Sequence, residues 1–183
     1  MRYLQIITIL FTLINIPINY IYTADEFSNV SKRESVLKVF KRAIELNEDF
    51  KNNVNVLPFE EYQKKRRLTE EYHEQKLEPA LSDCVIIFSS GNDIPLAKQF
   101  FNLLLSFENS ADEGLSITFG EIFLNNPDLI IKTFKKFKKP EQKILYEKLQ
   151  WGWLNVTTQE KIPEKKLRDR TGKMKQIESR IKK

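Results

Sequence analysis

The sequence predicts an all-α fold, a small bundle of about six to seven short helices that follows an N-terminal signal segment. Of the 183 residues, 41% are hydrophobic and 13 are phenylalanine, which is enough for a real core in one domain. Only five glycines and seven prolines are present, and this argues against a turn-rich all-β fold. Several stretches repeat apolar residues three and four positions apart, the spacing of one helix face.

The chain begins with an apolar segment that predicts export. Arg2 precedes an apolar run at 4–22, so residues 1–24 resemble a secretory signal peptide with a poor cleavage position after Ala24. The run is close to the minimum length of a spanning helix, so an uncleaved membrane anchor formed by residues 3–22 is one alternative. A buried helix of the fold is another. Under the first two interpretations, we expect the protein to be periplasmic or secreted, or held at a membrane.

The first half of the domain predicts one amphipathic helix and one charged helix. Residues 31–47 carry an apolar stripe, and Ser31 with Glu34 three positions later forms a capping-box pattern. Residues 47–58 predict a loop. Residues 58–78 have high helix propensity but few apolar positions. They predict a charged helix that contacts the body along a narrow seam or partly projects from it.

The middle of the chain predicts the core. Residues 80–90 have helical apolar spacing with Gly91 as a stop, although the stretch 84–88 also fits a short buried strand. The next helix, 94–107, begins after a plausible cap, Asp93, and has a wide apolar stripe. We therefore expect this helix to be the central and most buried one.

Three further short helices are predicted before the tail. They cover 115–126, then 126–137 with Asn126 as the cap, and then 139–153. Gly152 is expected to end the last of these, so that one flanking tryptophan closes the core and the other covers a loop. A sugar-stacking platform is the alternative interpretation of these tryptophans.

The domain is expected to span 25–158, and residues 159–183 form a basic tail. The tail has few large apolar residues, and we expect it to be flexible up to about Gly172. Beyond this point, three apolar residues share one face and predict a short helix that forms only against a partner: Met174, Ile177 and Ile181.

The residue types leave little room for catalysis. His73 is the only histidine and Cys84 the only cysteine, and Cys84 lies in an apolar stripe that predicts a core position. Glu70 and His73 share a helical face, but di-iron and zinc sites need more such ligands than this chain offers. We expect no cofactor, no metal and no catalytic residue. A hydrolase that uses carboxylates alone stays open, since 25 acidic residues give no basis for choosing a pair.

The stretch IIKTFKKFKK at 130–139 is the strongest functional signal. Its isoleucines and phenylalanines fall on one helical face and its lysines on the other, which is typical of an ordinary amphipathic helix with a solvated basic face. The charge distribution along the whole chain weakens this default interpretation. Residues 132–183 hold 17 basic and six acidic residues, a net charge of +11, while residues 1–131 carry −6. Such asymmetry suggests an anionic partner.

We therefore predict an anion-binding surface in the C-terminal third. Its candidate residues are Lys132, Lys135, Lys136, Lys138, Lys139, Lys165, Lys166, Arg168 and Arg170. The expected partner is an anionic membrane surface, a polyanion or an acidic protein; nucleic acid is not expected for an exported chain, and no small-molecule ligand is identifiable. These features favour an exported, non-catalytic interaction protein. The alternative is a helical inhibitor or protective protein that binds one specific protein by shape.

Overall fold

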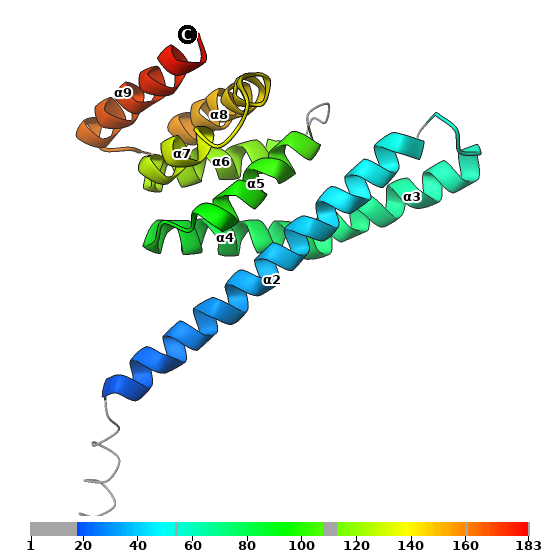
Figure 1. The fold of residues 1–183 in the computed structure, drawn as a ribbon, viewed down its shortest axis with the longest axis horizontal. Helices are drawn as coiled ribbons and strands as arrows, with labels where there is room; N and C mark the ends of the chain where they lie inside the picture. Colours follow the sequence, from blue (N-terminus) through cyan, green and yellow to red (C-terminus); the bar gives the residue numbers. More distant parts are fainter. Residues whose placement is uncertain (1–17, 54, 108–112, 160, 183) are drawn as a thin grey trace, which may run out of the picture.

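The computed structural model describes residues 18–53, 55–107, 113–159 and 161–182, with side chains from Val30 onward (Figure 1). These residues form helices and no strand, which confirms the all-α prediction. The helices are α2 (Ile18–Asn53), α3 (Phe59–Tyr72), the π-helix η1 (His73–Leu77), α4 (Glu78–Ser90), α5 (Ile94–Ser106), α6 (Glu113–Asn125), α7 (Pro127–Phe134), α8 (Lys139–Gln159) and α9 (Glu164–Ile181). Because α3, η1 and α4 form one continuous rod, the described residues contain seven helical rods.

The predicted signal segment lies mainly in residues 1–17, outside the described part of the chain. Among the helices that the structure does describe, none combines the length and the apolar character needed to cross a membrane.

The core is built around phenylalanine rings from α2, α4, α5, α6 and α7. On α5, Phe100 and Phe101 are both fully buried, in agreement with the prediction that this helix is central. The Phe101 ring centroid lies 5.1 Å from that of Phe119 on α6 and 5.2 Å from that of Phe134 on α7. Both pairs are edge-to-face, a geometry that adds about 0.5–1.5 kcal/mol beyond burial alone. Helices α4 to α8, together with residues 30–47 of α2, are called the body below.

Helices α6 and α8 cross at two glycines. A Cβ atom added to Gly152 would lie 1.7 Å from the carbonyl oxygen of Ser116, and one added to Gly120 would lie 2.5 Å from the Gly152 backbone. Only glycine permits this close backbone approach. Gly152 therefore does not end its helix as the sequence predicted, because α8 continues to Gln159. Trp153 packs against Phe123 with ring centroids 5.6 Å apart.

The first helix is longer than the sequence predicted at both ends. Ser31 and Glu34 lie inside α2, so the capping-box pattern does not mark a helix start. The expected loop at 47–58 is reduced, since α2 continues to Asn53. The reason is local: no glycine or proline occurs from residue 18 to Pro58, so nothing interrupts the helix.

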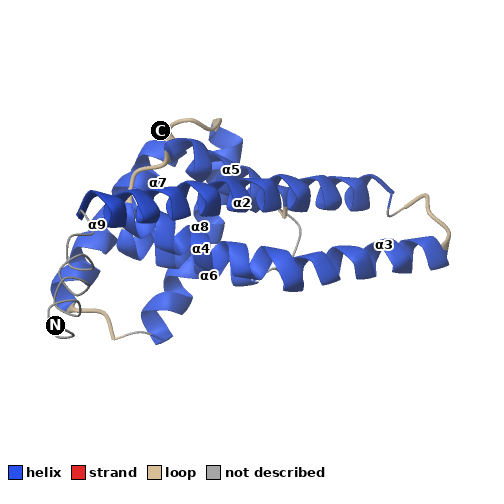
Figure 2. Ribbon diagram, turned by 90° about the horizontal axis from the view of Figure 1, so that it is seen from below, coloured by secondary structure: helices blue, strands red, loops and turns tan. Residues whose placement is uncertain are grey.

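An arm, residues 48–72, projects from the body. It consists of the end of α2, a short turn and α3, which run side by side away from the body (Figure 2). None of the residues of α3 is buried, as expected for a charged helix with a narrow seam. The seam contains the rings of Phe50 and Tyr62, whose centroids are 5.3 Å apart, and an ion pair of 2.6 Å between Lys65 Nζ and an Asp49 carboxylate oxygen.

The basic tail is a helix, which differs from the expected flexible segment. Helix α9 begins at Glu164 and passes through Gly172 without a break. Met174 and Ile177 are buried against the body, which α9 contacts through α7 and α8. Two of the three residues of the apolar stripe predicted to need a partner, Met174 and Ile177, are therefore covered by the protein's own body. This docking could not be read from the segment alone, since it depends on the surface that α7 and α8 create.

Candidate anion-binding groove

Helix α7 ends before the lysine cluster. Its start matches the prediction, because the Asn126 side-chain oxygen accepts a hydrogen bond of 3.2 Å from the Leu129 amide. Its end comes at Phe134, earlier than predicted, because Gln142 donates hydrogen bonds of 3.0 and 2.8 Å to the carbonyls of Phe134 and Phe137. Pro140 then favours a new helix start, so the chain turns a corner between α7 and α8.

The five predicted lysines of this segment lie around that corner, and all are exposed: Lys132 on α7, Lys135, Lys136 and Lys138 in the turn, and Lys139 at the start of α8. The apolar face is confirmed, since Ile130, Ile131 and Phe134 are buried. Phe137 is partly buried and packs against Phe101, with ring centroids 5.3 Å apart. The phenylalanines therefore serve mainly the core, and the lysines form the exposed part of this segment.

The last turn of α9 reaches the same corner and completes a groove. The Lys139 ammonium donates a hydrogen bond to the carbonyl oxygen of Arg180, which joins the start of α8 to the end of α9. The groove between these helices and α7 has a volume of about 400 Å³. We call it the C-terminal groove. Its floor consists of Ile131, Phe134, Ile177 and Ile181, and its rim of Lys135, Lys139, Gln142 and Arg180.

The three cations of the rim have no carboxylate partner in the described part of the chain. The ion pairs of the C-terminal third join Arg168 to Glu164, Arg170 to Asp169, Lys173 to Asp128 and Lys182 to Glu178. Lys135, Lys139 and Arg180 belong to none of these pairs. Three positive charges therefore surround an apolar floor, where a nearby low-dielectric surface strengthens their field relative to that of isolated charges in water.

The acid nearest to the rim along α9 is already engaged. A hydrogen bond from Lys182, followed by the charge of the same ammonium, lowers the pKa of Glu178 below its usual range. Glu178 is therefore an ionised partner of Lys182. It also raises the pKa of Tyr146 on α8, after the larger effect of burial.

The other four predicted residues lie at the opposite end of α9, and three of them have contacts within the protein. Arg170 donates a hydrogen bond of 2.9 Å to the Leu124 carbonyl, and its side chain is only 17% exposed. Lys166 lies 3.4 Å from the Asn125 side-chain oxygen, and Arg168 pairs with Glu164 on its own helix. Lys165 is exposed. Arg180 lies twelve positions after Arg168, about 18 Å along the helix, so the predicted surface is divided into two groups.

Arg180 is the rim cation that sequence reasoning missed. Arg180 directly precedes Ile181, which belongs to the same apolar stripe as Ile177, and this order is visible in the sequence. The stripe alone gave no indication that α9 would lie beside the α7–α8 corner.

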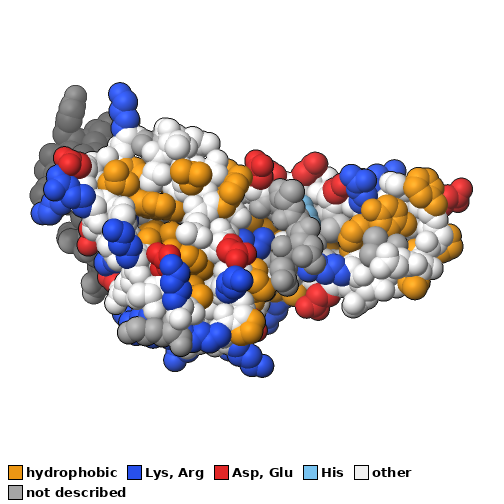
Figure 3. Space-filling model, turned by 90° about the horizontal axis from the view of Figure 1, so that it is seen from above, with side chains coloured by type: hydrophobic (Ala, Val, Ile, Leu, Met, Phe, Trp, Pro, Cys, Tyr) orange, Lys and Arg blue, Asp and Glu red, His pale blue; other side chains and the backbone are white. Residues whose placement is uncertain are grey.

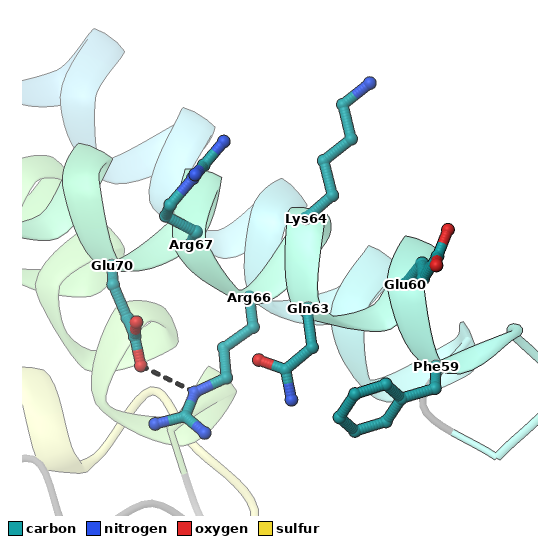
Figure 4. Close-up of a pocket in the computed structure, with 7 residues that line it drawn as sticks. All are labelled: Phe59, Glu60, Gln63, Lys64, Arg66, Arg67 and Glu70. Carbon is teal, nitrogen blue, oxygen red and sulfur yellow. Dashed lines mark hydrogen bonds and ion pairs between the residues drawn. The ribbon is translucent and has the colours of Figure 1, made fainter.

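A second hollow lies along the outer face of α3 and has a different character. It has a volume of about 720 Å³ and is open, because its lining comes from this one helix (Figure 4). Figure 4 shows Arg66 bonded to Glu70, a distance of 2.7 Å, while Phe59 extends from the first turn. Without a second element opposite, this face does not enclose a ligand.

The residues considered for catalysis have structural surroundings. Cys84 is fully buried, and this burial raises the pKa of its thiol. The His73 ring packs on Phe107, with ring centroids 5.0 Å apart. In the part of the chain that the structure describes, no group of three or more His, Cys, Asp or Glu side chains is placed to hold a metal ion.

Comparisons with protein-family models, curated proteins and solved structures find no match to this chain. Its function therefore has to be inferred from its own residues.

Proposed function

We propose that this chain is an exported, non-catalytic interaction protein whose C-terminal groove binds an acidic segment of a partner protein. The supporting observation is the rim of Lys135, Lys139 and Arg180, three cations without carboxylate partners above an apolar floor. The export part rests on the pattern of residues 1–24.

The apolar floor favours a peptide segment over other anions. A protein segment combines carboxylates with apolar side chains, so it matches both the rim and the floor. A sulfated polysaccharide offers charge with little apolar surface, and a flat anionic membrane contacts projecting lysines more readily than a concave floor. Among the partners considered from the sequence, an acidic protein fits this groove best.

The expected affinity is modest and sensitive to salt. Exposed ion pairs contribute about 0.2–1 kcal/mol each, and three of them contribute on the order of 1–3 kcal/mol. One buried apolar side chain adds about 1.5–3 kcal/mol, before the cost of ordering the peptide is subtracted. We therefore expect transient binding that weakens as the ionic strength rises.

The test compares two variants of equal charge. The groove variant is Lys135→Glu with Arg180→Glu, which leaves the Lys139 contact to α9 in place. The control variant is Lys161→Glu with Lys165→Glu, two exposed residues away from the groove. Each pair of substitutions changes the formal net charge from +5 to +1. Circular dichroism establishes that both variants remain helical.

The probe is a fluorescent glutamate-rich peptide that contains phenylalanine, together with a version in which alanine replaces phenylalanine. We expect the groove variant to bind the first peptide about tenfold more weakly than the wild type, and the control variant to lose less than about threefold. The alanine peptide should bind more weakly than its phenylalanine match. Equal losses in both variants, or preferential binding to anionic vesicles or a sulfated polysaccharide, would overturn the proposal.

A further inference from the structure

The tip of the arm combines acidic residues with exposed apolar side chains, the combination expected of a segment that binds the C-terminal groove. The arm tip, residues 48–61, contains four acidic residues and one basic residue, a net charge of −3. Two large apolar side chains are exposed there, Val56 at 74% and Phe59 at 75%. Figure 3 shows hydrophobic atoms gathered at the outer end of the arm.

Phe59 and two glutamates form the most suitable part of this tip. Phe59, Glu60 and Glu61 are consecutive in the first turn of α3, and all three are exposed. Neither glutamate belongs to an ion pair in the described residues, whereas Asp49 is paired with Lys65. The tip therefore presents an aromatic ring beside two available carboxylates. The groove presents an apolar floor beside three available cations.

The two surfaces do not meet within one molecule. Helix α3 packs against α2 and continues into η1, while α9 packs against α7 and α8. In Figure 1 the tip and α9 lie at opposite ends of the long axis. A contact between them has to join two molecules.

We propose that the arm tip of one copy binds in the C-terminal groove of a second copy. Phe59 lies on the apolar floor, and Glu60 and Glu61 face Lys135, Lys139 and Arg180. This inference rests on the proposed function, because it takes the groove as a site for an acidic segment and names that segment as the chain's own.

The contact is head-to-tail, so each copy uses two different surfaces. Such heterologous contacts do not stop at a dimer unless the rotation between copies closes a ring. The interface is small, and small interfaces are characteristic of transient association. We therefore expect a mass that rises steadily with protein concentration and falls as salt screens the charges.

Sedimentation equilibrium of the full chain tests this proposal over a series of protein concentrations, at about 50 mM and about 500 mM salt. At low salt, the weight-average mass of the wild type should rise above the 21.7 kDa of one chain. At high salt it should return to that value. The groove variant, Lys135→Glu with Arg180→Glu, should stay monomeric at low salt, and the control variant, Lys161→Glu with Lys165→Glu, should associate like the wild type.

A complementary pair of variants makes the test specific to these two surfaces. The tip variant, Glu60→Lys with Glu61→Lys, should stay monomeric alone. An equimolar mixture with the groove variant should associate again, because the acidic tip of one fits the basic groove of the other. Phe59→Ala should weaken wild-type association about tenfold, and circular dichroism verifies that each variant remains helical.

The outcomes separate the two proposals. A wild type that stays monomeric at every concentration overturns self-association, and so does a mixture that fails to associate. If the groove variant also loses binding to the glutamate-rich peptide, the proposed function stands while self-association fails. If the wild type binds neither the peptide nor itself, both proposals fail.

Discussion

Helices α2, α4, α5 and α6 fully bury six phenylalanine side chains in the body, whereas α3 in the arm buries no residue. The arm is stabilised instead by interactions between residues that are close together in space along its two helices. It has ion pairs one turn apart, Arg66 with Glu70 and Arg67 with Glu71, and a thin seam against the end of α2. Exposed pairs of this kind contribute a few tenths of a kcal/mol each. The free energy of unfolding is therefore concentrated in the body.

This contrast shows where the chain can accept change. A body residue is constrained by its neighbours in a dense core, while a residue on α3 contacts mainly solvent. Regions with few buried contacts also open locally before the whole protein unfolds. The arm is thus the part that can be adapted for binding with the least loss of folding stability.

The largest expected effect on the free energy of unfolding is the difference between replacing a phenylalanine of the body and replacing one of the arm. Phe101→Ala removes a fully buried ring that packs on Phe119 and Phe134, and we expect it to lower the free energy of unfolding by about 3–5 kcal/mol. Phe59→Ala removes a ring that is mostly exposed, so its effect should stay within about 0.5 kcal/mol. Urea denaturation measures both. Similar losses for the two variants would break the contrast between body and arm.

The next effect concerns the crossing of α6 and α8. Gly152→Ala places a methyl group against the Ser116 carbonyl, and the helices have to separate. We expect a loss of about 3 kcal/mol, at the upper end of the range for overpacked sites. Gly172→Ala is the matched control, because its added methyl group has open space around it. That control should gain about 0.5–1 kcal/mol, and thermal unfolding shows the difference in sign.

A smaller effect depends on pH and on one carboxylate of the body. Asp93 caps α5 through a bond of 3.0 Å from the Leu96 amide and also accepts hydrogen bonds from Arg33. Burial opposes its ionisation, but these bonds outweigh burial and lower its pKa. Asp93→Ala should therefore cost about 1–2 kcal/mol at neutral pH.

The sign of the pH dependence follows from this lowered pKa. The contribution of Asp93 is complete above the unfolded-state pKa of about 3.9 and is lost as the pH falls through the lower folded-state value. Urea denaturation at several pH values should show the wild type and Asp93→Ala converging below about pH 4. A constant difference into strong acid would contradict this assignment.

The smallest expected effect lies in the arm. Arg66→Gln removes the exposed pair with Glu70, and we expect it to change the free energy of unfolding by less than about 0.5 kcal/mol. The difference should disappear at about 500 mM salt, since screening removes the pair's contribution. Urea denaturation at two salt concentrations provides the comparison. A loss above about 2 kcal/mol would show that the arm has a cooperative role in folding.

Sequence reasoning succeeded where the determinants are local. The caps at Asp93 and Asn126 were predicted because each acts on an amide three residues later. The exposed character of α3 was predicted because an isolated helix face is read directly from spacing. The apolar face of 130–137 followed from the same spacing.

It failed where the determinants are tertiary. Gly152 has the residue type of a helix stop, and only the proximity of Ser116 explains its place inside α8. Arg180 joined the groove because α9 docks on α7 and α8, a contact that no single segment encodes. The predicted basic surface was divided for the same reason, since Arg170 serves the end of α6.

The continuous rod of α3, η1 and α4 fixes the direction in which the arm tip faces. Each residue of an α-helix rotates the chain by about 100°, because 3.6 residues complete a turn. Deleting one residue between η1 and Phe59 would therefore turn this ring by more than a quarter of a circle about the rod. Deleting seven residues, about two turns, together with a matching shortening of α2, would restore its orientation at a shorter reach. The number of residues in the arm thus sets both how far its tip reaches and the direction in which the tip faces.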